Sequence, residues 1–126
     1  MSNNFELLQL ATLRLSQDGP IKDRLFEAYD AHLSDLDFDE LPEGMRAEFG
    51  AMCEAMHREP PQIRESTVRA SVRKMSVIEA REYAALVVRL FAAMARQDAA
   101  RAAAAAARNG SVRSPAPMLQ LIAAEG

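Results

Sequence analysis

The sequence predicts an all-α protein, a bundle of four or five helices around a long C-terminal helix that begins after Ser76, with a short tail. Three observations support this class. Apolar side chains recur at three- and four-residue intervals through most of the chain, which is typical of helices with one buried face. Prolines lie between these segments. Only one short segment also fits a strand, and it would lack a pairing partner.

The first two helices are expected on either side of a turn at Gly19. A dense apolar stretch follows Asn3 and Asn4, both residue types favoured at helix N-caps, and predicts a helix over residues 5–17. Pro20 stands where a second helix would begin, a position that suits proline. That helix is expected from apolar residues at helical spacing: Ile21, Leu25, Tyr29, His32, Leu33 and Leu36.

An acidic stretch, residues 34–43, separates these helices from a third. Pro42 makes the stretch a connection or the first turn of the next helix. The third helix is predicted from a stripe at helical spacing: Met45, Phe49, Met52 and Met56. The prolines at 60 and 61 end it. We interpret the stripe as core, the alternative being an adaptable groove for a partner helix.

Residues 66–75 fit both a strand and a helix, and we prefer a short helix capped by Ser66. A capping box, Ser76 with Glu79, opens the final helix. Its large apolar side chains span an arc of about 160°, so we place this helix at the centre of the bundle. An alanine-rich continuation to Arg108 would make a rod of about 50 Å, whose end projects, frays or packs against another chain.

We expect residues 1–110 to form the helical domain and residues 111–126 a flexible tail. The tail carries an apolar segment that is a candidate for partner binding, and its docking on the same bundle, a sister chain or another protein stays open. The residues of this candidate site are Met118, Leu119, Leu121 and Ile122.

Composition indicates the cellular compartment, and the distribution of charge bears on the choice of partners. A single cysteine, no leader-like N-terminus and no long apolar run predict a cytoplasmic protein that is not in a membrane. Residues 1–63 carry 5 basic and 13 acidic side chains, whereas residues 64–126 carry 10 basic and 5 acidic ones. Such asymmetry governs the choice of partners more than the stability of the fold.

The densest basic cluster is a candidate site for an anion or for an acidic partner. Two of its arginines lie four residues apart and share a helix face. The alternative is that these cations pair with acidic residues of the N-terminal half, within one chain or across a dimer. The cluster consists of Arg64, Arg69, Arg73, Lys74 and Arg81.

Other chemistries are less well supported. The first turn of a DNA-reading helix at residues 77–79 would offer side chains poorly suited to base edges. The acidic stretch allows a nucleic-acid-mimicking inhibitor only as a minor alternative. Cys53 and His57 lie four apart, but two ligands do not make a metal site, and a buried structural cysteine is the better interpretation. The sequence has no phosphate-binding glycine loop and no nucleophile motif.

We therefore expect a non-catalytic binding or regulatory protein, without cofactor or metal, that acts through protein–protein interaction and self-associates as a homodimer. The partner protein is not identified by the sequence. The alternative is an anion or nucleic-acid binding module that uses the basic cluster between residues 64 and 81.

Overall fold

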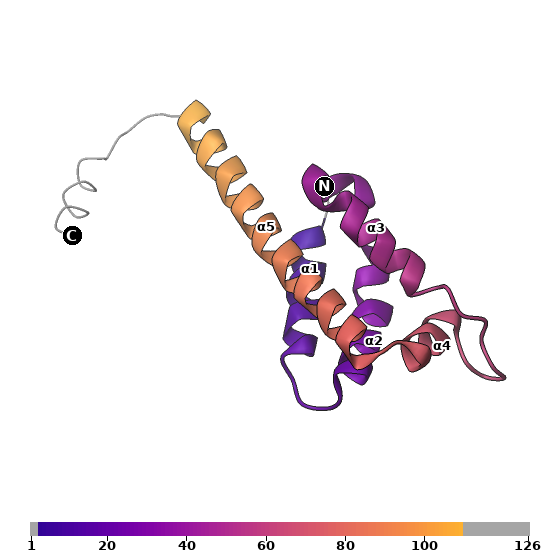
Figure 1. Cartoon of the computed structure of the whole chain (residues 1–126). Helices are drawn as coiled ribbons and strands as arrows, with labels where there is room; N and C mark the ends of the chain where they lie inside the picture. The colour runs from indigo at the N-terminus through magenta and orange to yellow at the C-terminus, as the bar shows by residue number, and fades with distance from the viewer. Residues whose placement is uncertain (1–2, 110–126) are drawn as a thin grey trace. The chain divides into compact units, whose positions relative to one another are not determined.

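The computed structural model describes residues 3–109, and in this range it is all-helical, which confirms the predicted class (Figure 1). Three short 3₁₀ helices, η1 (Leu33–Asp35), η2 (Phe38–Glu40) and η3 (Glu43–Met45), cross the acidic stretch. The chain divides into two compact units, residues 1–95 and residues 96–126. The α-helices are α1 (Asn4–Leu15), α2 (Ile21–Ala31), α3 (Arg46–Ala55), α4 (Thr67–Lys74) and α5 (Val77–Asn109).

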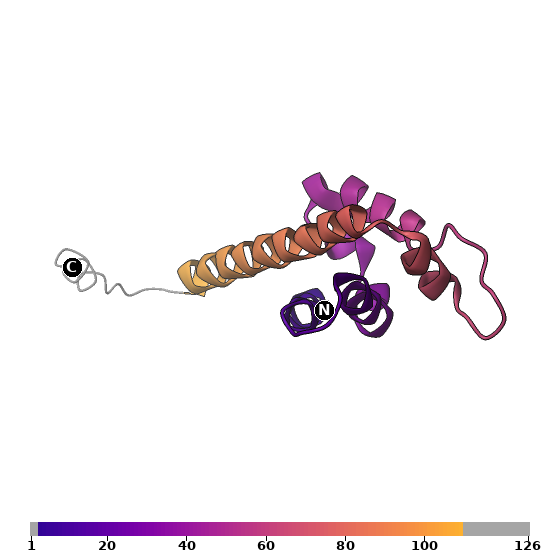
Figure 2. The ribbon, with the colours of Figure 1, turned by 60° about the horizontal axis from the view of Figure 1, so that its bottom comes forward.

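In the first unit, the N-terminal part of α5 packs against α1 and α2 on one side and against α3 on the other (Figure 2). The rings of Phe5 in α1 and Phe91 in α5 have centroids 5.3 Å apart. The predicted apolar arc of α5 includes its buried face, which belongs to the core of the first unit. Its buried members include Leu86, Val87, Leu90 and Met94.

Serine caps begin both α4 and α5. Ser66 Oγ accepts a hydrogen bond from the Arg69 backbone N–H at 3.0 Å, so residues 67–74 form the helix that we preferred over a strand. Ser76 Oγ accepts from the Glu79 N–H at 2.9 Å. The return bond of the capping box is not made, because the Glu79 carboxylate instead pairs with Arg58 at 2.8 Å. The box is therefore half formed.

The two asparagines at the start of α1 do not act as the sequence suggested. Asn3 occupies the N-cap position but makes no side-chain capping bond. Asn4 is fully buried; its Nδ2 donates to the Asp37 carbonyl and its Oδ1 accepts from the Asp37 N–H, both at 2.8 Å. The Asn4 side chain therefore ties α1 to the acidic stretch, a long-range contact that capping statistics cannot reveal.

The acidic stretch is a connection that is anchored at both ends by apolar side chains. Leu33 and Leu41 are buried, while most of the carboxylates between them face solvent. Beyond it, Phe49, Met52 and Met56 are buried, so the methionine stripe belongs to the core, as predicted. Helix α3 ends at Ala55, several residues before the prolines that we expected to end it.

The second unit is described only over residues 96–109, which continue α5. None of these residues is buried. The helix reaches Asn109, the last described residue, one position beyond the predicted end. The apolar segment at residues 118–122 and the boundary at residue 110 lie outside the described residues. Between residues 3 and 109 no helix has the length and apolar character needed to cross a membrane.

Candidate functional site

The residues of the predicted basic cluster lie in four different places. Lys74 pairs with Glu59, with Nζ 3.7 Å from Oε1. Arg64 lies in the loop before α4 with a left-handed backbone (φ 63°), next to an Ile63 side chain that is 91% exposed. Arg81 is exposed on α5, and it has no ion-pair partner within residues 3–109. Only Arg69 and Arg73 lie in one cleft.

That cleft lies between α2 and α4 and has a volume of about 220 Å³. Its lining adds one cation that sequence reasoning missed, because Lys22 on α2 donates a hydrogen bond from Nζ to the Arg73 carbonyl at 2.8 Å. The contact spans 51 positions of the chain, and only packing of α2 on α4 brings the two residues together. The residues that line the cleft are Lys22, Asp23, Arg69, Val72 and Arg73.

Ion pairs hold the two arginines of the cleft. Arg73 Nε and Nη2 bind the two carboxylate oxygens of Glu65 at 2.8 and 3.1 Å. This guanidinium lowers the pKa of Glu65 to about 2, with help from the Gln62 backbone N–H. The Arg69 guanidinium lies 4.6 Å from the centroid of the Phe26 ring, and its Nη1 is 3.7 Å from Asp23 Oδ1. The alternative interpretation, pairing with acidic residues of the N-terminal half, thus applies to Arg69 and Lys74, while Arg73 pairs with Glu65 of its own half.

A second candidate surface is an apolar groove of about 250 Å³ where α5 meets α1 and the start of α2. Thr12 and Leu15 lie on its α1 side, and Ala84, Ala85 and Val88 on its α5 side. Thr12 Oγ1 is buried and has no hydrogen-bond partner in the described part of the chain. Helix α1 also exposes two large apolar side chains, Leu10 and Leu13.

Helix α5 continues this surface with a stripe of small apolar residues that the sequence reasoning also missed. At 100° per residue the stripe lies opposite the buried face that contains Val87 and Leu90. Its three- and four-residue spacing could have revealed the stripe in the sequence, but alanine is so abundant in this helix that the spacing does not stand out. The stripe consists of Ala85, Val88, Ala92 and Ala95, and the sequence repeats the spacing at Ala99, Ala102 and Ala106.

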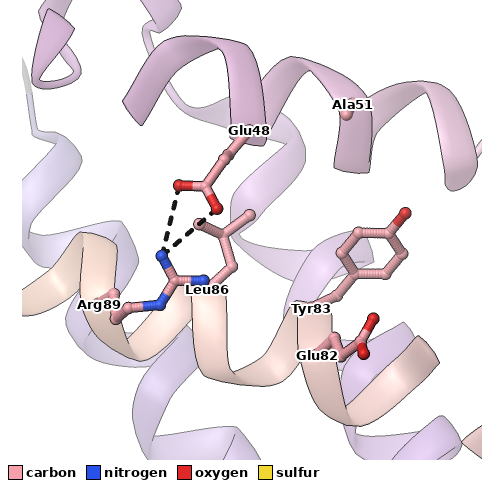
Figure 3. A pocket seen from close by; sticks show the side chains of 6 residues that line it. All are labelled: Glu48, Ala51, Glu82, Tyr83, Leu86 and Arg89. Carbon is pink, nitrogen blue, oxygen red and sulfur yellow. Dashed lines mark hydrogen bonds and ion pairs between the residues drawn. The ribbon is translucent and has the colours of Figure 1, made fainter. Parts of the chain in front are cut away.

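A third cavity, of about 350 Å³, lies between α3 and α5 (Figure 3). Arg89 of α5 reaches Glu48 of α3, with Nη1 at 3.3 Å from Oε1, and Leu86 lies beside this pair. Tyr83 donates a hydrogen bond to Glu79 at 3.3 Å rather than into the cavity. The lining therefore combines an internal ion pair with apolar surface and presents no nucleophile next to a base.

Cys53 and His57 contact a common partner, the buried phenol of Tyr29. Tyr29 Oη lies 3.2 Å from His57 Nε2, and the Cys53 thiol also interacts with the phenol. Burial raises the pKa of the Cys53 thiol, while the hydrogen bond from Tyr29 opposes this rise. Burial likewise raises the pKa of Tyr29. Within residues 3–109 no group of three potential metal ligands occurs.

The acidic stretch keeps its carboxylates away from cationic side chains. Within the described range, no ion pair involves residues 35–43. Asp37 Oδ1 accepts a hydrogen bond from the Asp39 N–H at 3.1 Å, and Arg46 binds the backbone carbonyls of Asp39 and Leu41. The stretch is thus a structured surface of carboxylates that covers a short segment, not a whole face.

Comparison of the chain with protein-family models, curated proteins and solved structures finds no match.

Proposed function

We propose that the protein is a non-catalytic helical binding protein that self-associates and acts through protein–protein contacts made by the exposed face of α5. The observation that carries this proposal is the stripe of small apolar residues on α5, from Ala85 to Ala95, bordering the apolar groove. Spacing of this kind defines the seam along which two helices interlock. Small side chains at the seam let the two backbones approach closely.

A second copy of the chain is the occupant that fits this face best. The groove lining is mostly apolar, and a symmetric pair of such faces is self-complementary. The apolar segment of the tail, around Leu119 and Ile122, is proposed to extend this contact or to recruit another protein.

Val88 provides the test, because it lies at the centre of the stripe and is 47% exposed. Full burial of a valine is worth about 1.5–3 kcal/mol, so covering the remaining half contributes about 1 kcal/mol per copy. A symmetric dimer contains the contact twice. Val88→Glu is therefore expected to weaken dimerisation at least about 30-fold, which sedimentation equilibrium can measure.

Ile63→Glu is the control, since Ile63 is an exposed β-branched side chain in the loop before α4, away from the α5 face. Its dimer constant should equal that of the wild-type chain. A wild-type chain that remains monomeric at high micromolar concentration would refute self-association, and equal effects of the two substitutions would refute the assigned face. A pull-down with and without residues 111–126 tests the contribution of the tail.

A further inference from the structure

We infer that the cleft between α2 and α4 is a binding site for a phosphomonoester group, held by Lys22, Arg69 and Arg73. It lies on different helices from the α5 stripe, so the two proposals stand or fall separately. The cleft is about 220 Å³ in volume, which suits a single anionic group, and cations reach it from both helices.

Arg69 is the best-prepared of the three cations. Its guanidinium lies 4.6 Å from the centroid of the Phe26 ring, which restricts its orientation. Its closest carboxylate, Asp23, is 3.7 Å away, beyond hydrogen-bond distance. Within residues 3–109 no acceptor is hydrogen-bonded to this guanidinium, which has five N–H donors. Arg69 is thus held in place while its donors remain available to a ligand.

Lys22 and Arg73 each keep part of their donor capacity. Arg73 uses Nε and Nη2 on Glu65, which leaves Nη1. Lys22 uses one of its three N–H donors on the Arg73 carbonyl. That bond places an ammonium at the C-terminal end of α4, where it offsets the negative end of the helix dipole. The last carbonyl groups of α4 therefore repel a bound anion less than they would without the Lys22 ammonium.

The charge balance of the cleft favours a bound anion. Three cations face the carboxylates of Asp23 and Glu65, so the surplus is one positive charge at neutral pH. A phosphomonoester carries a charge of about −1.5 to −2 at pH 7 and three acceptor oxygens, enough for one contact to each cation. A sulfate monoester carries only one negative charge, and a carboxylate has one negative charge and two acceptor oxygens.

A nucleic-acid backbone fits this surface less well than a single phosphate group does. Its charges are spread along a polymer, and tight binding requires several phosphates to be neutralised. Two neighbouring cations, Arg58 and Lys74, are already paired with Glu79 and Glu59. A polyanion that extended to these two cations would also meet their carboxylates.

The test is an amide chemical-shift titration of the full chain with inorganic phosphate and with a phosphoserine peptide, at constant ionic strength. Saturable shifts should centre on Lys22 and on residues 69–73. Arg69→Gln and Lys22→Gln should each weaken binding about tenfold, as expected for loss of a hydrogen bond to a charged group. Asp23→Asn should tighten binding, because it removes the carboxylate that competes for Arg69.

Arg81→Gln is the control, because it removes one positive charge from an exposed arginine outside the cleft. It should leave the affinity unchanged. Equal affinity for both probes would support free phosphate as the source, and tighter binding of the peptide would support a phosphorylated segment of a partner. Absence of saturation, equal weakening by Arg81→Gln, or tighter and steeply salt-dependent binding of a duplex oligonucleotide would overturn the inference.

Discussion

Replacing Asn4 should destabilise the protein far more than replacing its neighbour Asn3, although both residues look like helix caps in the sequence. The Asn4 side chain is fully buried and makes two 2.8 Å hydrogen bonds to the backbone of Asp37. Each such bond contributes about 1 kcal/mol net. Alanine would regain a few tenths of a kcal/mol through its higher helix propensity. We therefore expect Asn4→Ala to cost about 2 kcal/mol.

Urea unfolding of the two single variants measures this difference. Asn3 is exposed and makes no side-chain capping bond, so Asn3→Ala should change the free energy of unfolding by less than about 0.5 kcal/mol. Amide shifts of residues 35–43 should also move in Asn4→Ala, because the acidic stretch loses its tie to α1. A cost below about 0.5 kcal/mol for Asn4→Ala, or a larger cost for Asn3→Ala, would refute this account of the contact.

Two further predictions concern titrating groups. The pKa of Glu65 is lowered to about 2, so the contribution of its pair with Arg73 to stability is present above the ordinary value of 4.5 and is lost as pH falls toward 2. A carboxyl titration by NMR should show this low midpoint, and Arg73→Gln should move it toward 4.5; an unchanged midpoint would exclude Arg73 as the cause. Burial raises the pKa of the Cys53 thiol, so its reaction with a disulfide reagent should have a midpoint above that of a free cysteine, and Tyr29→Phe should raise it further. A midpoint below the free-cysteine value would indicate an activated thiol instead.

The fold was largely predictable because the signals that determine it are local. The apolar spacing of α5, the serine caps at 66 and 76 and the core role of Met52 and Met56 follow from residues within one or two turns of each other. Two of the errors, those at Glu79 and Asn4, have the same cause. The side chains of Glu79 and Asn4 form hydrogen bonds with Arg58 and Asp37. These partners are distant in sequence, so local patterns do not reveal them.

The candidate sites were harder to predict, because each combines residues from different helices. Sequence spacing correctly placed Arg69 and Arg73 on one face of α4, but it grouped them with Arg81, which lies outside the cleft. Lys22 joins them only because α2 packs on α4. The groove likewise needs α1 and α5 together, and neither helix reveals it alone.

The ion pairs of this protein decide which charges are available to a ligand more than they decide its stability. Exposed pairs contribute about 0–1 kcal/mol each, and most of those seen here are exposed. Their larger effect is to neutralise cations such as Lys74 and Arg89 in place. Arg81 remains unpaired within residues 3–109 but lies outside the cleft, whereas Arg69 combines free donors with a concave setting. If positive charge alone attracted phosphate, Arg69→Gln and Arg81→Gln would weaken phosphate binding equally. If the geometry of the cleft is required, only Arg69→Gln would weaken it.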